Sequence, residues 1–258
     1  MDPALEALAF QFGRYLSIAT SRPGTLPSNL NGAWLIGDAS QFWNADYHFN
    51  INVQMNYWPN LVTNLAETAE PFIEWMESLR VPGRVTAGAT SAVPSGPGEE
   101  NGFLVHTVNN IFGLTAPYGV QEFGWNIGGS TWALQNVGEY HKFTQDGELL
   151  RDRIYPMQRE LANFWLTYLW WSPYQDRLVV TPSVSAEQGP PSTAPPTTSR
   201  SCGSCSATRS ALPGSWGLTT IWSLGGPTPG AARSRADRRV GPDQGMVRGD
   251  HLRPGAGG

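Results

Sequence analysis

Aromatic residues stop well before the end of this chain, which limits the part of it that can form a core. All 10 Phe and all 8 Tyr of the 258 residues lie before residue 175, together with nine of the 11 Trp. Residues 190–258 contain no Phe, Tyr, Glu or Lys, yet hold eight Arg and both cysteines. So little apolar surface cannot offset the entropy lost on ordering, and we expect a disordered tail there. The fold is therefore expected within residues 1–189.

Within that part, helical periodicity is the dominant pattern, and long loops rich in Gly and Pro separate the helices. Pro156 lies inside the last helical stretch and is expected to kink or divide it. Residues 178–181 read as a short strand or extended segment. An all-α toroid or bundle is expected, with function carried on the loops. The predicted helices cover residues 5–19, 71–80, 130–143 and 148–171, and the predicted loops cover 21–46 and 81–101.

The segment Trp43–Pro59 is the most unusual in the chain. Its seventeen residues include five aromatic residues other than His, four Asn, one Gln, one Asp and one His. If residues 49–53 are extended, the polar residues at positions 48, 50, 52 and 54 share one face. Amide groups bond hydroxyls as donors and as acceptors, and aromatic rings cover the apolar faces of a sugar. The segment therefore predicts a carbohydrate site. For any single Asn, a bond to loop backbone is the commoner role, but the alternating set favours the site.

Composition and charge argue against several other classes of function. The net charge is −4, and no basic stripe appears in residues 1–189, which argues against a nucleic-acid partner. No run of 18 apolar residues predicts a membrane span, and the first residues lack the pattern of a signal peptide. The four His are scattered, so neither a metal site nor a cofactor is expected. Cys202 and Cys205 stand in the tail without a second pair, and we interpret them as chance.

Several blocks together resemble family 95 of the glycoside hydrolases, in the order in which that family has them. The resemblance covers about residues 5–189. This segment is similar to the first part of the family's catalytic (α/α)6-barrel domain, so the resemblance implies a partial toroid of the six-hairpin glycosidase type. The blocks are Gln11–Leu16, Ser21–Pro27, Trp43–Pro59, Val105–Pro117 and Thr181–Gly189.

The resemblance implies hydrolysis of α-1,2-linked L-fucosides with inversion, and hence a fucosylated glycan as substrate. Inversion needs an acid that protonates the leaving oxygen and a base that activates water on the opposite face. Glu187 matches the general acid, although a solvated loop carboxylate is the common role of a lone Glu. Asn50 and Asn52 match two amides that hold the attacking water. A downstream Asp backs them in the family, because an amide alone is a poor base.

Substrate contacts are also implied. His48 matches a histidine that contacts the sugar. Trp125 is a further candidate contact, although burial in the core is equally compatible with it. His106 and Asn109 are weaker candidates. The resemblance also suggests a secreted, periplasmic or cell-surface location.

The resemblance ends at Gly189. In the family, segments such as Gly-Thr-Thr-Tyr-Asp-Gln and Val-Trp-Glu-Leu-Phe follow the acid. This chain has Ala194–Ser199 and Ser201–Ser206 instead. Both segments can be encoded by codons that, when they are read in the frame one base earlier, encode the family's residues. We therefore predict that the reading frame slips between Gly189 and Ala194, so that residues 190–258 are out-of-frame translation. A natural disordered linker is the alternative.

Three functions are compatible with these observations. The first is a fragment of an inverting α-L-fucosidase, which we expect to be inactive and poorly stable alone because the water-activating Asp and the second half of the barrel are expected downstream. The family's β-rich domain is expected upstream. The second is a related α-L-galactosidase, because Asn and Trp contacts do not separate the two sugars. The third is a carbohydrate-binding remnant without turnover.

Overall fold

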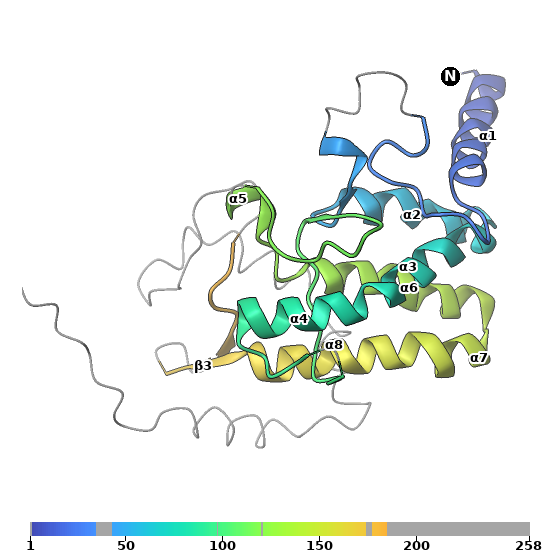
Figure 1. Cartoon of the computed structure of the whole chain (residues 1–258). Helices are drawn as coiled ribbons and strands as arrows, with labels where there is room; N and C mark the ends of the chain where they lie inside the picture. Colours follow the sequence, from blue (N-terminus) through green and yellow to red (C-terminus); the bar gives the residue numbers. More distant parts are fainter. Residues whose placement is uncertain (1, 35–42, 97, 120, 174–176, 185–258) are drawn as a thin grey trace, which may run out of the picture. The chain divides into compact units, whose positions relative to one another are not determined.

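The computed structural model describes residues 2–34, 43–96, 98–119, 121–173 and 177–184 (Figure 1). This part is mostly helical, which confirms the predicted all-α class and agrees with a partial toroid. The predicted tail lies outside the described residues. The α-helices are α1 (Pro3–Thr20), α2 (Asn52–Val62), α3 (Glu70–Ser78), α4 (Arg80–Ser91), α5 (Gln121–Gly124), α6 (Gly129–Thr144), α7 (Gly147–Leu149) and α8 (Tyr155–Tyr168). Short 3-10 turns lie at η2 (Trp43–Ala45) and η3 (Ala66–Ala69).

Three helices follow the predicted ranges closely, namely α1, α3 and α6. The start of α1 is set by Asp2, whose side chain accepts a hydrogen bond from the backbone N–H of Ala4 at 2.9 Å, and by Pro3, which needs no N–H partner in the first turn. None of the residues of α1 is buried. No helix among the described residues is long and apolar enough to span a membrane.

The last predicted helix is divided, as expected, near Pro156. A short α7 leads into the π-helical turn η4 (Leu150–Ile154), and α8 begins at Tyr155 with Pro156 in its first turn. The predicted end at Trp171 was wrong. Leu169 is extended, and Trp170–Ser172 forms β3, which pairs antiparallel with β4 (Arg177–Val179). This hairpin partly confirms the strand predicted at residues 178–181.

Residues 81–91 form α4 rather than the predicted loop. Pro82 lies in the first turn, where its missing N–H is not needed. Gly83 allows a close approach of the chain around Leu104, whose backbone N–H donates to the Gly83 carbonyl at 3.0 Å. A Cβ on Gly83 would lie 3.1 Å from the Cβ of Phe103 and 3.2 Å from the Leu104 carbonyl oxygen. Pro82 is therefore compatible with the start of α4, and Gly83 leaves room for the segment that packs on it.

The extended conformation considered for residues 49–53 was also wrong. Only Tyr47 and His48 form a strand there, a turn follows, and α2 begins at Asn52. The buried residues of α2 recur at helical spacing, so packing of this face overrides the alternating polarity. These buried residues are Val53, Gln54, Tyr57, Asn60 and Leu61.

One hydrophobic core joins the helices. α2 packs on α6, and α8 contacts both α6 and α4. Large side chains that are fully buried come from α3, from α8, from the turn after residue 48 and from the segment before residue 108. They are Phe72, Met76, Met157, Phe164, Phe49 and Phe103. The core therefore holds the loops that follow α4 and precede α6 against the helices.

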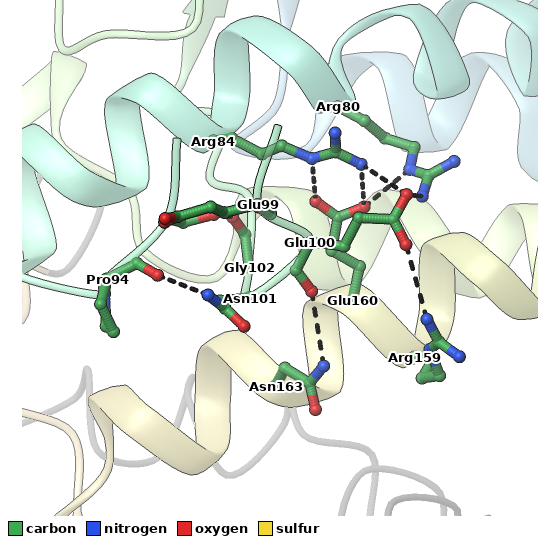
Figure 2. Close-up of polar contacts among 11 residues, drawn as sticks. Arg80, Arg84, Pro94, Glu99, Glu100, Asn101, Gly102, Arg159, Glu160 and Asn163 are labelled. Atoms are coloured by element: carbon green, nitrogen blue, oxygen red, sulfur yellow. Dashed lines mark hydrogen bonds and ion pairs between the residues drawn. The ribbon is translucent and has the colours of Figure 1, made fainter. Parts of the chain in front are cut away.

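A buried ion cluster ties α4 to α8 (Figure 2). Glu160 of α8 is 1% exposed and accepts from Arg84 at 2.6 Å and from Arg80 at 2.8 Å. Glu100, from the loop after α4, contacts both arginines from the surface side at 3.2 and 3.5 Å. Because two cations share the buried carboxylate, its charge is compensated. This cluster is structural and lies on other elements than the predicted site.

Candidate functional site

A two-stranded ribbon forms the base of the candidate site. β1 (Tyr47–His48) pairs antiparallel with β2 (Val108–Asn109), with Tyr47 opposite Asn109 and His48 opposite Val108. The backbone N–H of Phe49 continues the pairing by donating to the Thr107 carbonyl at 2.8 Å. Three predicted site residues, at positions 48, 106 and 109, thus lie on segments joined by backbone hydrogen bonds.

A third segment, residues 124–126, closes against this ribbon. The Thr107 N–H donates to the Gly124 carbonyl at 3.2 Å, and the Asn126 side-chain amide reaches the Phe49 carbonyl at 3.4 Å. Gly129, at the start of α6, is needed for this approach, because a Cβ there would lie 3.2 Å from the Phe49 Cβ and 3.3 Å from the Val105 carbonyl oxygen. Trp125 is therefore placed beside the ribbon.

The chain enters β1 through a left-handed turn. Trp43, Asn44 and Ala45 all have φ between 51° and 53°, a region that side chains with a Cβ seldom adopt. The turn brings the Trp43 ring edge-on to the His48 ring, with centroids 4.9 Å apart. Strained backbone of this kind is found most often at functional sites, where surrounding contacts hold it in place.

His48 is paired with an acid that the sequence analysis had not assigned. Its Nδ1 lies 2.6 Å from Oδ1 of Asp46, and both side chains are buried. The backbone of Asp46 is fixed on both sides, since its N–H donates to the Trp43 carbonyl at 3.1 Å and its carbonyl accepts from Leu30 at 2.8 Å. The pair occupies positions i and i+2, which share a face in extended chain. That spacing was the signal from which Asp46 could have been found.

His106 is fully buried and lies beside Trp125, with ring centroids 4.9 Å apart and the ring planes tilted by 43°. Its Nδ1 accepts a hydrogen bond from the backbone N–H of Asn126 at 3.0 Å. Burial lowers the pKa of His106 from its ordinary 6.5 to about 4, so the ring is neutral at neutral pH. Two candidate residues of the sequence analysis, His106 and Trp125, are thus neighbours.

Several buried polar atoms of this region have no hydrogen-bond partner among the described residues. Such groups are uncommon in folded proteins, because a buried donor or acceptor without a partner costs about 1–3 kcal/mol. Their concentration around the ribbon is typical of a site that binds a polar ligand. The atoms are Oδ2 of Asp46, Nε2 of His106, Oγ1 of Thr107, Oδ1 of Asn109 and Nε1 of Trp125.

Asn50 and Asn52 follow the ribbon directly but do not share an extended face. Asn50 lies in the turn after β1, and Asn52 is the first residue of α2; both side chains are partly buried. Gln54, which is fully buried, holds this turn by donating from Nε2 to the Phe49 carbonyl at 2.8 Å. The two amides therefore reach the region of the ribbon through a turn and a helix start, and Gln54 supports them.

Glu187, the expected general acid, lies outside the described residues. The other six candidates lie within them, at β1, the turn after it, the start of α2, the segment of His106 and β2, and the segment that follows α5. Within the described part of the chain, no group of three or more His, Cys, Asp or Glu side chains is arranged to hold a metal ion. Buried amide, imidazole and indole groups beside aromatic rings are suited to a sugar.

Comparison with known proteins connects these residues to a family. The model of the glycosyl hydrolase family 95 catalytic domain matches residues 1–210. The chain belongs to glycosyl hydrolase family 95. The predicted resemblance to this family is confirmed.

Curated fucosidases are similar to this chain over much of its length. Probable alpha-fucosidase A of Aspergillus niger is 37% identical over 191 residues, which is 73% of this chain and 23% of that protein. Alpha-L-fucosidase 2 of Arabidopsis thaliana is 36% identical over 170 residues, 65% of this chain and 19% of that protein. The chain thus spans about a fifth of the length of the family 95 relatives that it matches.

Proposed function

We propose that the ribbon, the segment of His106 and the segment of Trp125 form part of the sugar site of an α-L-fucosidase that acts on fucosylated glycans. The observation that carries the proposal is the family 95 match together with the buried polar atoms around β1 and β2 that lack partners within the described residues. Hydroxyl groups of a fucose ring would satisfy such atoms. Aromatic faces at Trp43 and Trp125 would cover the apolar side of the ring.

The proposed reaction is inversion at an α-1,2 linkage. Asn50 and Asn52 would hold the attacking water, and Glu187 would protonate the leaving oxygen. His48, His106, Asn109 and Trp125 would contact the substrate. Support for the first two roles is positional, since Asn50 and Asn52 follow the ribbon directly and Gln54 holds their turn.

We further propose that the 258-residue chain binds sugar without turning it over. An amide cannot deprotonate water by itself, and the Asp that would back Asn50 and Asn52 is not assigned in this chain. The two relatives are named as fucosidases and are about four to five times as long as the segments that match this chain. An α-L-galactoside remains the alternative substrate, because L-galactose differs from L-fucose by one hydroxyl group.

Titration of the 258-residue chain with L-fucose and L-galactose, followed by heteronuclear NMR, tests the sugar site. We expect saturable shifts with L-fucose at the Trp125 indole, and no release of fucose from an α-1,2-fucosylated oligosaccharide. His48→Gln should weaken binding, whereas His141→Gln, at a half-buried position of α6 outside the ribbon, should not. Absence of saturable binding by either sugar contradicts the proposed site, and measurable turnover contradicts the proposed inactivity.

The origin of residues 190–258 is a separate proposal. We propose that they are out-of-frame translation that begins between Gly189 and Ala194. The support is that one offset restores family-like residues at two places, Ala194–Ser199 and Ser201–Ser206. Sequencing the coding DNA decides it. An uninterrupted frame that lacks the required bases would refute the proposal and favour a natural linker.

A further inference from the structure

Two histidines of the candidate site are held by hydrogen-bond partners of opposite kind. At His48 the partner of Nδ1 is a carboxylate oxygen of Asp46, 2.6 Å away. At His106 the partner of Nδ1 is the backbone N–H of Asn126, 3.0 Å away. A carboxylate oxygen accepts a hydrogen bond, whereas a backbone N–H can only donate one. The two contacts therefore require different protonation of the two rings.

We propose that Asp46 and the Asn126 amide are positioning groups that hold His48 and His106 in opposite neutral tautomers. His48 carries its hydrogen on Nδ1, so its Nε2 is an acceptor. His106 carries its hydrogen on Nε2, which is a donor. The site thus offers one accepting and one donating ring nitrogen. Their assignment to a sugar rests on the proposed function, but the tautomers themselves do not.

Burial of the two histidines and their partners strongly favours one tautomer at each ring. Asp46 is 6% exposed, and the His48 ring is its only side-chain partner among the described residues. A buried carboxylate needs such a donor, because desolvation without compensation is costly. His106 is fully buried, and a hydrogen on its Nδ1 would face the N–H of Asn126. Neither ring can exchange tautomers without losing its partner.

Asp46 is suited to position the ring as well as to set its tautomer. Its backbone is bonded to Trp43 on one side and to Leu30 on the other, and the left-handed turn precedes it directly. The Trp43 ring lies edge-on against His48, at 4.9 Å between centroids. The His48 imidazole is therefore held by a charge-assisted hydrogen bond to Asp46 and by contact with the Trp43 ring. The same arrangement fixes the orientation in which Nε2 meets a ligand.

For a bound sugar, the consequence is that the two ring nitrogens recognise different groups, one that donates a hydrogen bond and one that accepts a hydrogen bond. A hydroxyl group can donate to Nε2 of His48, whereas Nε2 of His106 requires an oxygen that accepts. Nε2 of His106 and Nε1 of Trp125 are both donors without partners among the described residues, and their rings lie with centroids 4.9 Å apart. An oxygen with two lone pairs, such as a ring or hydroxyl oxygen, would satisfy both donors. A group that only donates would be excluded from that position.

The test is direct observation of the ring nitrogens of the 258-residue chain by 15N NMR at pH 8. Single His→Gln variants assign the four histidines. We expect the Nδ1–H form at His48 and the Nε2–H form at His106, each favoured more than about tenfold, since the bonds involved are charge-assisted or buried. Nε2–H at His48, both nitrogens protonated there, or Nδ1–H at His106 overturns the proposal. Random-coil signals from all four rings would overturn it too.

The variant Asp46→Asn tests the cause. Its amide can donate as well as accept, so the preference at His48 should fall by about tenfold, while that at His106 stays unchanged. Asp152→Asn, at an exposed carboxylate paired with Arg151, is the matched control and should alter neither ring. An unchanged tautomer preference of His48 in Asp46→Asn would show that Asp46 does not set the tautomer. If the tautomers are as expected but no sugar binds, the proposed function fails and this inference stands.

Discussion

Arg84 binds Glu160 through two hydrogen bonds, from Nε to Oε1 at 2.6 Å and from Nη2 to Oε2 at 3.0 Å. The side chains are 8% and 1% exposed, so the pair is desolvated on both sides. The hydrogen bond that Arg84 donates to Glu160 is the largest of the influences that raise the pKa of Arg84 above its ordinary value. This pair joins α4, which the sequence had not predicted, to α8 of the main core (Figure 2).

We expect Glu160→Gln to lower the free energy of unfolding by about 3 kcal/mol, because it leaves Arg80 and Arg84 without their buried counter-charge. Urea denaturation followed by Trp fluorescence measures the change. Glu100→Gln is the matched control, since Glu100 contacts the same two arginines but is 50% exposed. Its expected cost is below about 1 kcal/mol. Equal effects from the two variants would contradict the buried role of Glu160.

The buried imidazole of His106 makes stability depend on pH. Its pKa is about 4 in the folded chain and 6.5 ordinarily, so between these values the unfolded chain binds a proton that the folded chain does not. The free energy of unfolding therefore falls as the pH is lowered from 6.5 toward 4. The loss that this group contributes is about 3 kcal/mol in total. Denaturation curves at several pH values measure it.

The variant His106→Asn separates this effect from other titrations. An Asn side chain keeps an oxygen that accepts from the Asn126 N–H but does not titrate. We expect a flatter dependence on pH between 4 and 6.5 than in the unaltered chain. His141→Gln, at a half-buried ring of α6, is the control for the loss of an imidazole elsewhere in the chain. A slope unchanged in His106→Asn would show that other groups cause it.

Gly102 is predicted to tolerate no side chain. Its φ is 154°, and a Cβ there would lie 2.7 Å from the Cβ of Phe164 and 2.9 Å from its Cα. Because Phe164 is fully buried, the contact cannot relax cheaply, and Gly102→Ala should cost about 2–4 kcal/mol. Gly98→Ala in the same loop meets nothing within 4 Å and should change stability by less than about 0.5 kcal/mol. Thermal unfolding of both variants gives the comparison.

How far the sequence predicted the structure depends on which force decided each element. Periodic helices with clear ends, such as α1 and α6, were predicted closely, because local spacing and capping decide them. α4 was missed because Pro82 and Gly83 are breakers by local rules, whereas here one sits in a first turn and the other permits close packing. Tertiary contact decided that element, and local sequence does not report it.

The candidate site shows the same division. Two of the family blocks meet in the structure, because β1 of the block Trp43–Pro59 pairs with β2 of the block Val105–Pro117. Trp125, which lies outside the blocks, packs beside His106 with the rings tilted. The alternation around Asn50 gave the wrong local conformation, because burial of one face of α2 prevailed over it. The partner of His106, a backbone N–H from a segment twenty residues away, leaves no mark in the sequence.

The helix α1 leads to the last prediction. Its apolar residues recur at helical spacing, yet none is buried, and Leu8 is 65% exposed. In a toroid such a face packs against other helices, so it contributes little to stability in this chain alone. Leu8→Gln should therefore change the free energy of unfolding by less than about 0.5 kcal/mol while reducing association of the chain at high concentration. Leu161→Ala, in the core of α8 at 4% exposure, should cost about 2–5 kcal/mol. Urea denaturation and light scattering check both variants, and a Leu8→Gln variant as unstable as Leu161→Ala would mean that α1 packs within this chain after all.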